Sequence, residues 1–254
     1  MAMTSPLPID AVRLSAEFEQ AAATDILQWC YATFEPQRIK FSTSFGAEGM
    51  VLLHMLVTLV KQPRVFTIDT GRLFPGTYNV WQEVVARYGI EIETFFPEAA
   101  DITALTRTQG PNLFYDSVEQ RKQCCLVRKV KPLKKALADA DAWITGIRRG
   151  QSEARDTIAI VSYSHEHHVH KICPLAKWSE TDVWEYIRNN NVPYDKTHDL
   201  GYMSIGCQPC TRPSRPAEGQ RSCRWWWEKD THKECGLHRA EEPPTRAPRG
   251  EYTI

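Results

Sequence analysis

Residues 38–49 read RIKFSTSFGAEG, and this stretch decides the class of fold. Arg38 to Thr43 has the composition of a short β-strand. An apolar run with the character of a helix continues from Gly49 to about Val60. A strand, a Ser/Thr/Gly loop and a helix start form a layout that binds anions, because free backbone N–H groups and the helix dipole both favour negative charge. No Walker or Gly-x-Gly-x-x-Gly sequence occurs.

Strands and helices continue to alternate along the chain. The alternation predicts an α/β fold with a parallel sheet and crossover helices. After the first strand, we expect strands at residues 65–68, 90–96, 142–145 and 169–173, and helices within 1–36, 78–88, 120–138 and 179–188. Pro132 should interrupt the third of these helices. Residues 101–120 have the composition of a loop, and the chain beyond Cys210 shows no periodicity, which predicts an irregular C-terminal tail.

The composition excludes several classes of protein. Lys+Arg and Asp+Glu number 31 each, so the net charge is zero, which argues against general nucleic-acid binding. The longest apolar stretch, residues 49–60, is too short to span a bilayer, and the N-terminus lacks a secretory signal pattern. We therefore expect a cytoplasmic protein with no nucleic-acid or membrane partner. Structural disulfides are rare in that compartment, so eight cysteines indicate metal binding or thiol chemistry.

Polar loops follow three of the expected strands. The carboxyl ends of parallel strands meet at one edge of a sheet, where ligands bind, so we expect one shared anion site there. Paired arginines suit a planar oxyanion, although each loop alone also fits an ordinary polar turn. The candidate binding residues are Ser42, Thr43, Ser44 and Gly46 in the first loop, Asp69, Thr70, Gly71 and Leu73 in the second, and Arg148 and Arg149 in the third.

Two cysteine pairs predict an all-thiolate site. Cys124 and Cys125 lie in a segment, residues 121–135, with seven Lys or Arg and no acidic residue, and such cations favour thiolates. Cys207 and Cys210 form a Cys-x-x-Cys pair. Four thiolates can hold zinc or an iron–sulfur cluster, and adjacent cysteines favour the cluster because they suit a zinc tetrahedron poorly. A redox disulfide within the second pair is a third interpretation.

Cys235 is a candidate nucleophile near the end of the chain. It lies in the sequence KECGLH, residues 233–238, where Gly236 permits close backbone approach. By these residues alone it could also be incidental. Cys30 and Cys173 lie in apolar surroundings and are expected to serve packing, while Cys223 has no clear assignment.

Taken together, the motifs resemble the phosphoadenylyl- and adenylyl-sulfate reductase family from about Phe41 to His238. The specific parts are residues 44–48, 69–75, 145–149 and 234–238. The two cysteine pairs are similar to those of the cluster-containing, assimilatory adenylyl-sulfate branch. The sequence departs from the family at Gly76, where Glu is usual, and at Cys223, where a small non-thiol residue is usual.

The resemblance implies an adenine-nucleotide α-hydrolase-like core, with a five-stranded parallel sheet covered by helices on both faces. It implies three regions within one domain: a helical segment (1–36), a sulfonucleotide-binding core with the cluster (37–210) and a catalytic tail (211–254). It implies one [4Fe-4S] cluster per chain. The implied cluster ligands are Cys124, Cys125, Cys207 and Cys210, with Lys129 near cluster and substrate, and Arg221 and Arg224 on the sulfate or phosphate.

The resemblance also implies the chemistry. Cys235 attacks the sulfur of adenylyl sulfate, AMP leaves, and thioredoxin or a similar dithiol releases sulfite from the resulting S-sulfocysteine. An enzyme preferring the 3′-phosphorylated substrate, or accepting both, is the nearest alternative. An ATP-pyrophosphatase-type ligase would need a Ser-Gly-Gly-x-Asp-Ser loop, which Phe45 and Glu48 break. A non-catalytic zinc module with a Trp-rich binding tail is the third. A homo-oligomer is compatible with all of these.

Overall fold

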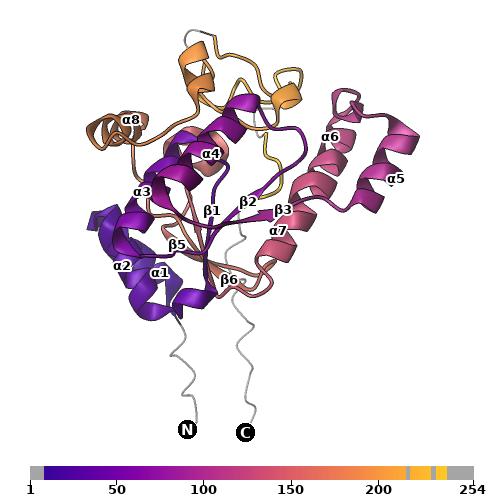
Figure 1. The fold of residues 1–254 in the computed structure, drawn as a ribbon. Coiled ribbons are helices and arrows are strands. Elements are labelled where there is room, and N and C mark those ends of the chain that lie inside the picture. The colour runs from indigo at the N-terminus through magenta and orange to yellow at the C-terminus, as the bar shows by residue number, and fades with distance from the viewer. Residues whose placement is uncertain (1–8, 216–217, 230–232, 239–254) are drawn as a thin grey trace, which may run out of the picture.

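The computed structural model describes residues 9–215, 218–229 and 233–238. Residues 1–8 of the expected helical segment and 239–254 of the expected tail lie outside the described residues. One central sheet carries helices on both faces (Figure 1). No helix of the described part is long and apolar enough to cross a membrane.

The sheet has six strands in the order β3-β2-β1-β4-β6-β5. All neighbours pair in parallel except β5 and β6, which are antiparallel. The five expected parallel strands are therefore confirmed. The sixth, β5, was not expected, because its sequence VSYS is largely polar and the following turn has no glycine; His168 takes the positive φ of 55° instead. The strands are β1 (Ile39–Ser42), β2 (Val65–Ile68), β3 (Ile92–Phe95), β4 (Ala142–Thr145), β5 (Val161–Ser164) and β6 (Val169–Ile172).

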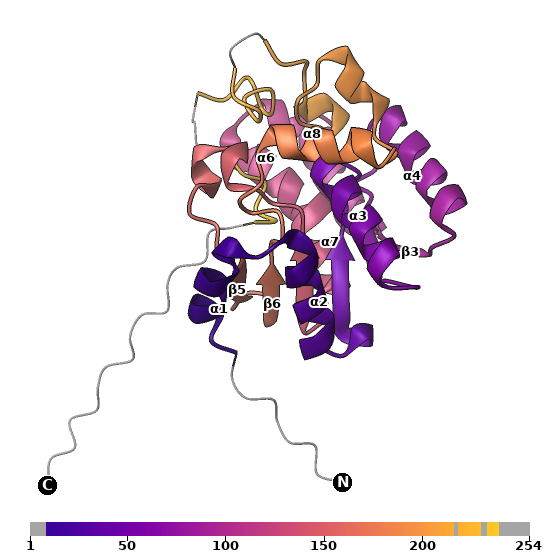
Figure 2. The same ribbon diagram turned by 90° about the vertical axis from the view of Figure 1, so that its left-hand side faces the viewer.

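Two apolar layers sandwich the sheet. On one face, α3 and its neighbours α2 and α8 form the larger core around Phe41 and Ile144. On the other face, α7 packs against β2 and β3 through Leu133 and Phe66. The turned view in Figure 2 shows α3 and α8 side by side. The helices are α1 (Ala11–Glu17), α2 (Ala23–Thr33), α3 (Ala47–Leu59), α4 (Pro75–Tyr88), α5 (Ala99–Gln109), α6 (Val118–Cys125), α7 (Lys131–Ala136) and α8 (Glu180–Asn189).

One local prediction was wrong. Residues 99–109 form α5 rather than a loop: Leu105 is buried, and Thr106 and Thr108 satisfy their hydroxyls on carbonyls one turn back.

The interruption expected at Pro132 is present. The α-helix α6 ends at Cys125, a π-helical stretch covers Leu126–Val130, and α7 begins at Lys131 with Pro132 in its first turn, where the missing proline N–H is accommodated.

The tail beyond Cys210 is irregular, as expected. Among its described residues the regular pairing is an isolated bridge between Thr211 and Arg224. The segment passes over the carboxyl ends of the parallel strands, and this route places it above the loops that follow β1, β2 and β4 (Figure 1).

Candidate active site

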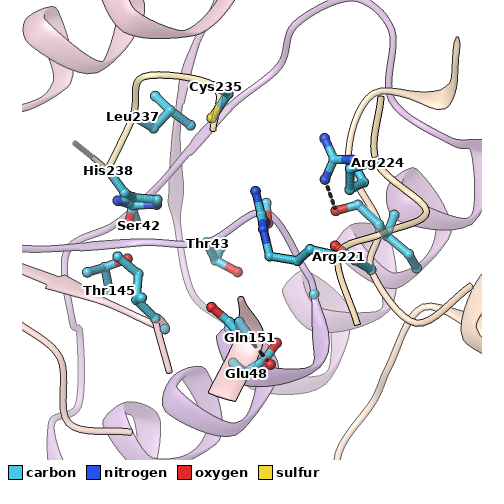
Figure 3. Close-up of a pocket in the computed structure, with 18 of the residues that line it drawn as sticks. Ser42, Thr43, Glu48, Thr145, Gln151, Arg221, Arg224, Cys235, Leu237 and His238 are labelled. Carbon is cyan, nitrogen blue, oxygen red and sulfur yellow. Dashed lines mark hydrogen bonds between the residues drawn. The ribbon is translucent and has the colours of Figure 1, made fainter. Parts of the chain in front are cut away.

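A pocket lies at the carboxyl ends of β1, β2 and β4, and the tail forms its other wall (Figure 3). The structure brings together most of the binding residues predicted from the sequence. Those lining the pocket are Ser42, Thr43, Ser44, Gly46, Thr70, Leu73, Lys129, Arg221, Arg224 and Cys235. Asp69, Gly71, Arg148 and Arg149 do not line it.

The loop between β1 and α3 is held in a fixed shape. The Thr43 hydroxyl accepts the Phe45 N–H at 3.0 Å, and Phe45 takes a φ of 59°. A Cβ on Gly49 would lie 2.7 Å from Thr43 Oγ1, so any other residue there would displace the Thr43 hydroxyl. Ser42 accepts the indole N–H of Trp143 at 2.8 Å. The start of α3 therefore presents free backbone N–H groups to the pocket without rearrangement.

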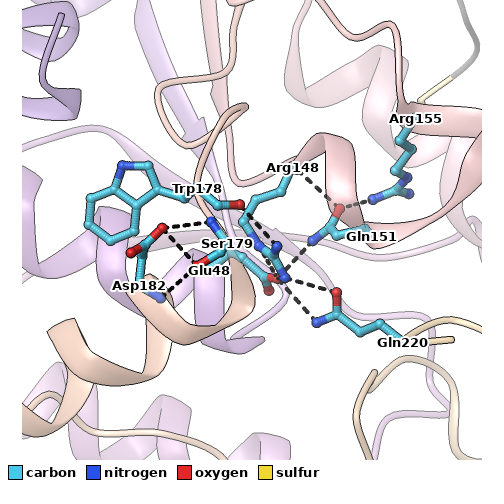
Figure 4. Close-up of polar contacts among 8 residues, drawn as sticks. All are labelled: Glu48, Arg148, Gln151, Arg155, Trp178, Ser179, Asp182 and Gln220. Atoms are coloured by element: carbon cyan, nitrogen blue, oxygen red, sulfur yellow. Dashed lines mark hydrogen bonds and ion pairs between the residues drawn. The ribbon is translucent and has the colours of Figure 1, made fainter. Parts of the chain in front are cut away.

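Arg148 lies one layer behind the pocket. Its guanidinium donates to Glu48 Oε1 at 2.9 Å, to Gln220 Oε1 at 2.8 Å and to the Trp178 carbonyl at 3.1 Å (Figure 4). Burial opposes the charge on Glu48, but Arg148 and the amide of Gln151 outweigh it and lower the pKa of that carboxyl. Arg148 thus ties α3 to the tail, and Glu48, Gln151 and Gln220 are site residues that the sequence reasoning did not single out.

Arg149 points away from the pocket. Its Nη1 donates to Glu19 at 2.9 Å and its Nε to the Ile158 carbonyl at 2.9 Å. The side chain joins the N-terminal segment to the core. No local sequence signal distinguishes it from Arg148, because the two residues differ in role only through their distant partners.

The loop after β2 links the pocket to the cysteines. Asp69 accepts the Gly71 N–H at 2.8 Å and the Tyr78 hydroxyl at 3.0 Å, so this carboxylate shapes the loop. The Thr70 hydroxyl lies 3.3 Å from Cys207 Sγ, and the Thr70 carbonyl accepts Arg128 Nη1 at 2.7 Å. A cysteine of the second pair, Cys207, therefore contacts a residue of the pocket and itself lines the pocket.

The four paired cysteines line one buried cavity. Cys124 and Cys125 come from the last turn of α6, Cys207 and Cys210 from a 3₁₀ turn, and all four are free thiols. The cavity is also lined by cationic Arg72, Arg121, Arg128 and Lys129. Among the described residues, no three His, Cys, Asp or Glu side chains meet in a single-ion geometry.

The electrostatics of this cavity favour a thiolate at Cys207, whereas burial raises the pKa of Cys124, Cys125 and Cys210. Burial opposes the Cys207 thiolate, but Lys129 and the Thr70 hydroxyl outweigh that effect and lower its pKa. Burial also opposes the charge on Lys129, yet the thiolates of Cys207 and Cys235 raise the pKa of Lys129. Four thiols around a cationic cavity are the donor set that an iron–sulfur cluster needs.

Residues 38–213 match the family model of the phosphoadenosine phosphosulfate reductase domain, which therefore covers the sheet, the loops and both cysteine pairs. The chain belongs to this family. The family expected from the motifs is thus confirmed.

Curated relatives align with this reductase-family chain over most of their length. Adenosine 5′-phosphosulfate reductase of Allochromatium vinosum is 45% identical over 226 residues, 89% of this chain and 87% of the relative. The protein of the same name from Burkholderia cepacia is 45% identical over 201 residues, 79% of this chain and 80% of the relative. The protein of the same name from Pseudomonas aeruginosa is 40% identical over 238 residues, which are 91% of this chain and 87% of the relative.

Solved structures support the fold of this family member. A phosphoadenylyl-sulfate reductase from Candida auris, in a phosphate complex, superposes with a TM-score of 0.69 at 27% identity, covering 83% of this chain and 100% of that one. An FMN adenylyltransferase from Candida glabrata, 14% identical, superposes with a TM-score of 0.56 over 85% of this chain and 71% of that one, which shows a shared fold. The expected α-hydrolase-like α/β architecture is confirmed.

In this family member the tail lies across the pocket, beyond the matched domain. Cys235 is half-buried against the cluster of residues that holds the cysteine pairs. Leu237 packs on the apolar layer of α7, and His238 stacks on Trp143. His232, the residue directly before this motif, lies outside the described residues. The docked tail therefore places the Cys235 thiol in the same pocket as Lys129. Figure 3 shows Cys235 together with Arg221 and Arg224 in this pocket.

Proposed function

We propose that this chain reduces adenosine 5′-phosphosulfate to sulfite and AMP in sulfate assimilation, with Cys235 as the nucleophile. The observation that carries the proposal is the placement of the Cys235 thiol in a pocket at the strand ends that also holds Lys129, Arg221 and Arg224. The names of the relatives at 40–45% identity support the same substrate.

The sulfuryl group is first transferred to Cys235, and an external dithiol then releases sulfite and regenerates the Cys235 thiol. The Cys235 thiolate attacks the sulfuryl sulfur, an S–S bond forms, and the S–O bond breaks as AMP leaves with its electron pair. A thiolate of an external dithiol, thioredoxin in our proposal, then attacks the Cys235 sulfur and sulfite leaves with the S–S electron pair. The second thiol resolves the mixed disulfide and returns Cys235 as a thiol. The dithiol supplies both electrons.

The cations and the anion loop stabilise this reaction. Lys129 and Arg224 line the same pocket as Cys235, and both neutralise charge that develops on the sulfuryl and phosphate oxygens. The N–H groups at the start of α3 bind the phosphate. The tail must undock to admit substrate and to expose Cys235 to the dithiol, so it acts as a lid.

Cys124, Cys125, Cys207 and Cys210 would hold one [4Fe-4S] cluster per chain, because all four line the same cationic cavity. When bound, the cluster supplies a fixed negative charge beside the site. Lys129 lines both cavities, so the cluster's charge would act on the substrate pocket through the ammonium group of Lys129. A zinc ion on the same thiols is the alternative occupant, and reduction of the 3′-phosphorylated nucleotide is the alternative activity. We propose a cytoplasmic location.

One set of measurements tests the function. Iron and acid-labile sulfide should each reach about four per chain, as a cubane requires. Incubation with adenosine 5′-phosphosulfate and no reductant should leave a sulfonate on the peptide that contains Cys235. Catalytic efficiency should be higher for this nucleotide than for its 3′-phosphorylated form. Stoichiometric zinc, or the absence of the adduct on Cys235, would contradict the proposal.

A further inference from the structure

Of the four cations considered in the pocket, two already have a carboxylate partner from the tail. Arg155 and Arg221 both bind the side chain of Glu234, the residue directly before Cys235. Lys129 and Arg224 form no ion pair with any carboxylate of the described residues. The pocket therefore contains two cations that the tail neutralises and two that remain for a ligand.

The contact to Glu234 is buried and has good geometry. Arg155 donates through Nε to Oε1 at 2.7 Å and through Nη2 to Oε2 at 3.0 Å, and Arg221 donates to Oε2 at 3.1 Å. The side chains of Arg155, Arg221 and Glu234 are 7%, 14% and 17% exposed, respectively, so solvent screens the two ion pairs weakly. Two-pronged arginine–carboxylate contacts of this kind are strong and directional.

A second contact holds the backbone at the same residue. Arg121 of α6 donates to the Glu234 carbonyl at 2.6 Å. Its guanidinium is itself fixed by two 2.8 Å bonds to Glu228 and lies over the Trp225 ring. Glu234 is thus held through its side chain and its main chain by three separate parts of the protein.

Glu234 remains charged at neutral pH in this arrangement. Burial opposes the carboxylate, but the hydrogen bond from Arg155 and the charge of Arg221 lower the pKa of Glu234. Burial and the neighbouring Arg155 lower the pKa of Arg221 to about 10, which still leaves the guanidinium protonated at pH 7.

We infer that Glu234 is a positioning residue, whose carboxylate is clamped by Arg155 and Arg221 so that Cys235 is held over the pocket. Arg221 then holds the tail through Glu234, and Lys129 and Arg224 bind the phosphosulfate group. The assignment of Lys129 and Arg224 to the substrate rests on the proposed function, whereas the contact of Glu234 with the two arginines does not. The opposite arrangement, in which Glu234 occupies the substrate's place and must leave, predicts different kinetics.

Alkylation of Cys235 in the ligand-free, metal-loaded protein tests the clamp. Glu234→Gln keeps the size of the side chain and removes its charge, so the tail should undock more often. We expect the rate of iodoacetamide modification, followed on the Cys235 peptide by mass spectrometry, to rise about tenfold or more. Glu218→Gln is the matched control, because Glu218 accepts two bonds from Arg212 in the same tail, at 2.7 and 2.9 Å, without contacting Glu234.

Kinetics separate the clamp from a substrate mimic. With the clamp, Glu234→Gln lowers kcat and leaves the dissociation constant of the nucleotide unchanged. Arg155→Gln should reproduce the faster alkylation, and the double variant should add little to either single change. Far-UV circular dichroism checks that each variant is folded.

Two results would overturn the inference: unchanged alkylation in a folded Glu234→Gln variant, or tighter nucleotide binding with kcat intact. Faster alkylation in a protein whose wild type reduces neither sulfonucleotide would support the clamp and overturn the proposed function alone.

Discussion

The imidazole of His238 stacks on the indole of Trp143, with ring centroids 5.3 Å apart and planes inclined by 19°. Trp143 belongs to β4, in the centre of the sheet, and is itself fixed by its bond to Ser42. The last described residue of the tail therefore lies on a rigid platform that also supports the loop after β1.

This stack should make docking of the tail sensitive to pH. Burial lowers the pKa of His238 well below its ordinary value, and the charges of Lys171, Arg155, Arg221 and Lys129 lower it further. The docked tail thus holds neutral imidazole, while an undocked tail gains a proton below about pH 6.5. Docking is at full strength above that pH and weakens as pH falls through it.

Hydrogen exchange of residues 233–238, corrected for intrinsic rates, would measure this loss between about pH 5 and pH 8. His238→Phe keeps an aromatic ring on Trp143 and cannot bind a proton, so its docking should not change over the same range. Equal pH dependence in both proteins would assign the effect to another group.

The Arg148–Glu48 pair should be important for stability. Arg148 is 1% and Glu48 12% exposed at the side chain. Arg148→Met leaves a buried carboxylate without its cation, which costs about 3–5 kcal/mol in the free energy of unfolding. The urea midpoint measures the change at constant m value. Asp141→Asn is the control, because its pair with Arg38 is about half exposed and should contribute less than about 1 kcal/mol.

Substitution of Gly76 should destabilise the protein. The carboxylate of buried Asp195 fills the space beside it, accepting from Thr77 at 2.9 Å, and a Cβ on Gly76 would overlap this carboxylate. Gly76→Ala should therefore lower the free energy of unfolding by about 1–3 kcal/mol. The gain in helix propensity, at most about 1 kcal/mol, does not offset that cost.

Gly219→Ala is the matched control, since nothing lies within 4 Å of the added methyl group. If Gly76→Ala were more stable than the wild type, Asp195 would have to move freely, contrary to its two hydrogen bonds with Thr77 and Thr197.

Loss of one paired cysteine should abolish the metal centre. We expect Cys207→Ser to contain much less iron and sulfide than the wild type and to lose the visible absorption of the cluster, because all four thiolates are needed as ligands. Cys223→Ser should retain both. Cys223 lines neither cavity, and its thiol lies 3.6 Å from two carbonyl oxygens that a hydroxyl can also bond. Equal iron in the two variants would exclude Cys207 as a ligand.

Short-range patterns were sufficient for the five parallel strands, the loop after β1 and the family. Residues 38–49 predict β1, its loop and α3 because a strand and a helix each have a period that a few neighbouring residues reveal. The same patterns failed where tertiary contacts compensate for weak propensity, as in α5 and β5.

The roles of individual charged residues depended on the folded chain. Adjacent Arg148 and Arg149 look alike in sequence, yet one supports the pocket and the other binds Glu19, which lies 130 residues away. Glu234 meets Arg155 across 79 residues. The amino-acid sequence determined the parallel strands, the family and which thiols come in pairs, since those signals are local. Which cation faces the ligand and which holds the tail was set by packing between distant segments, because a buried charge takes its role from the partner that the fold brings to it.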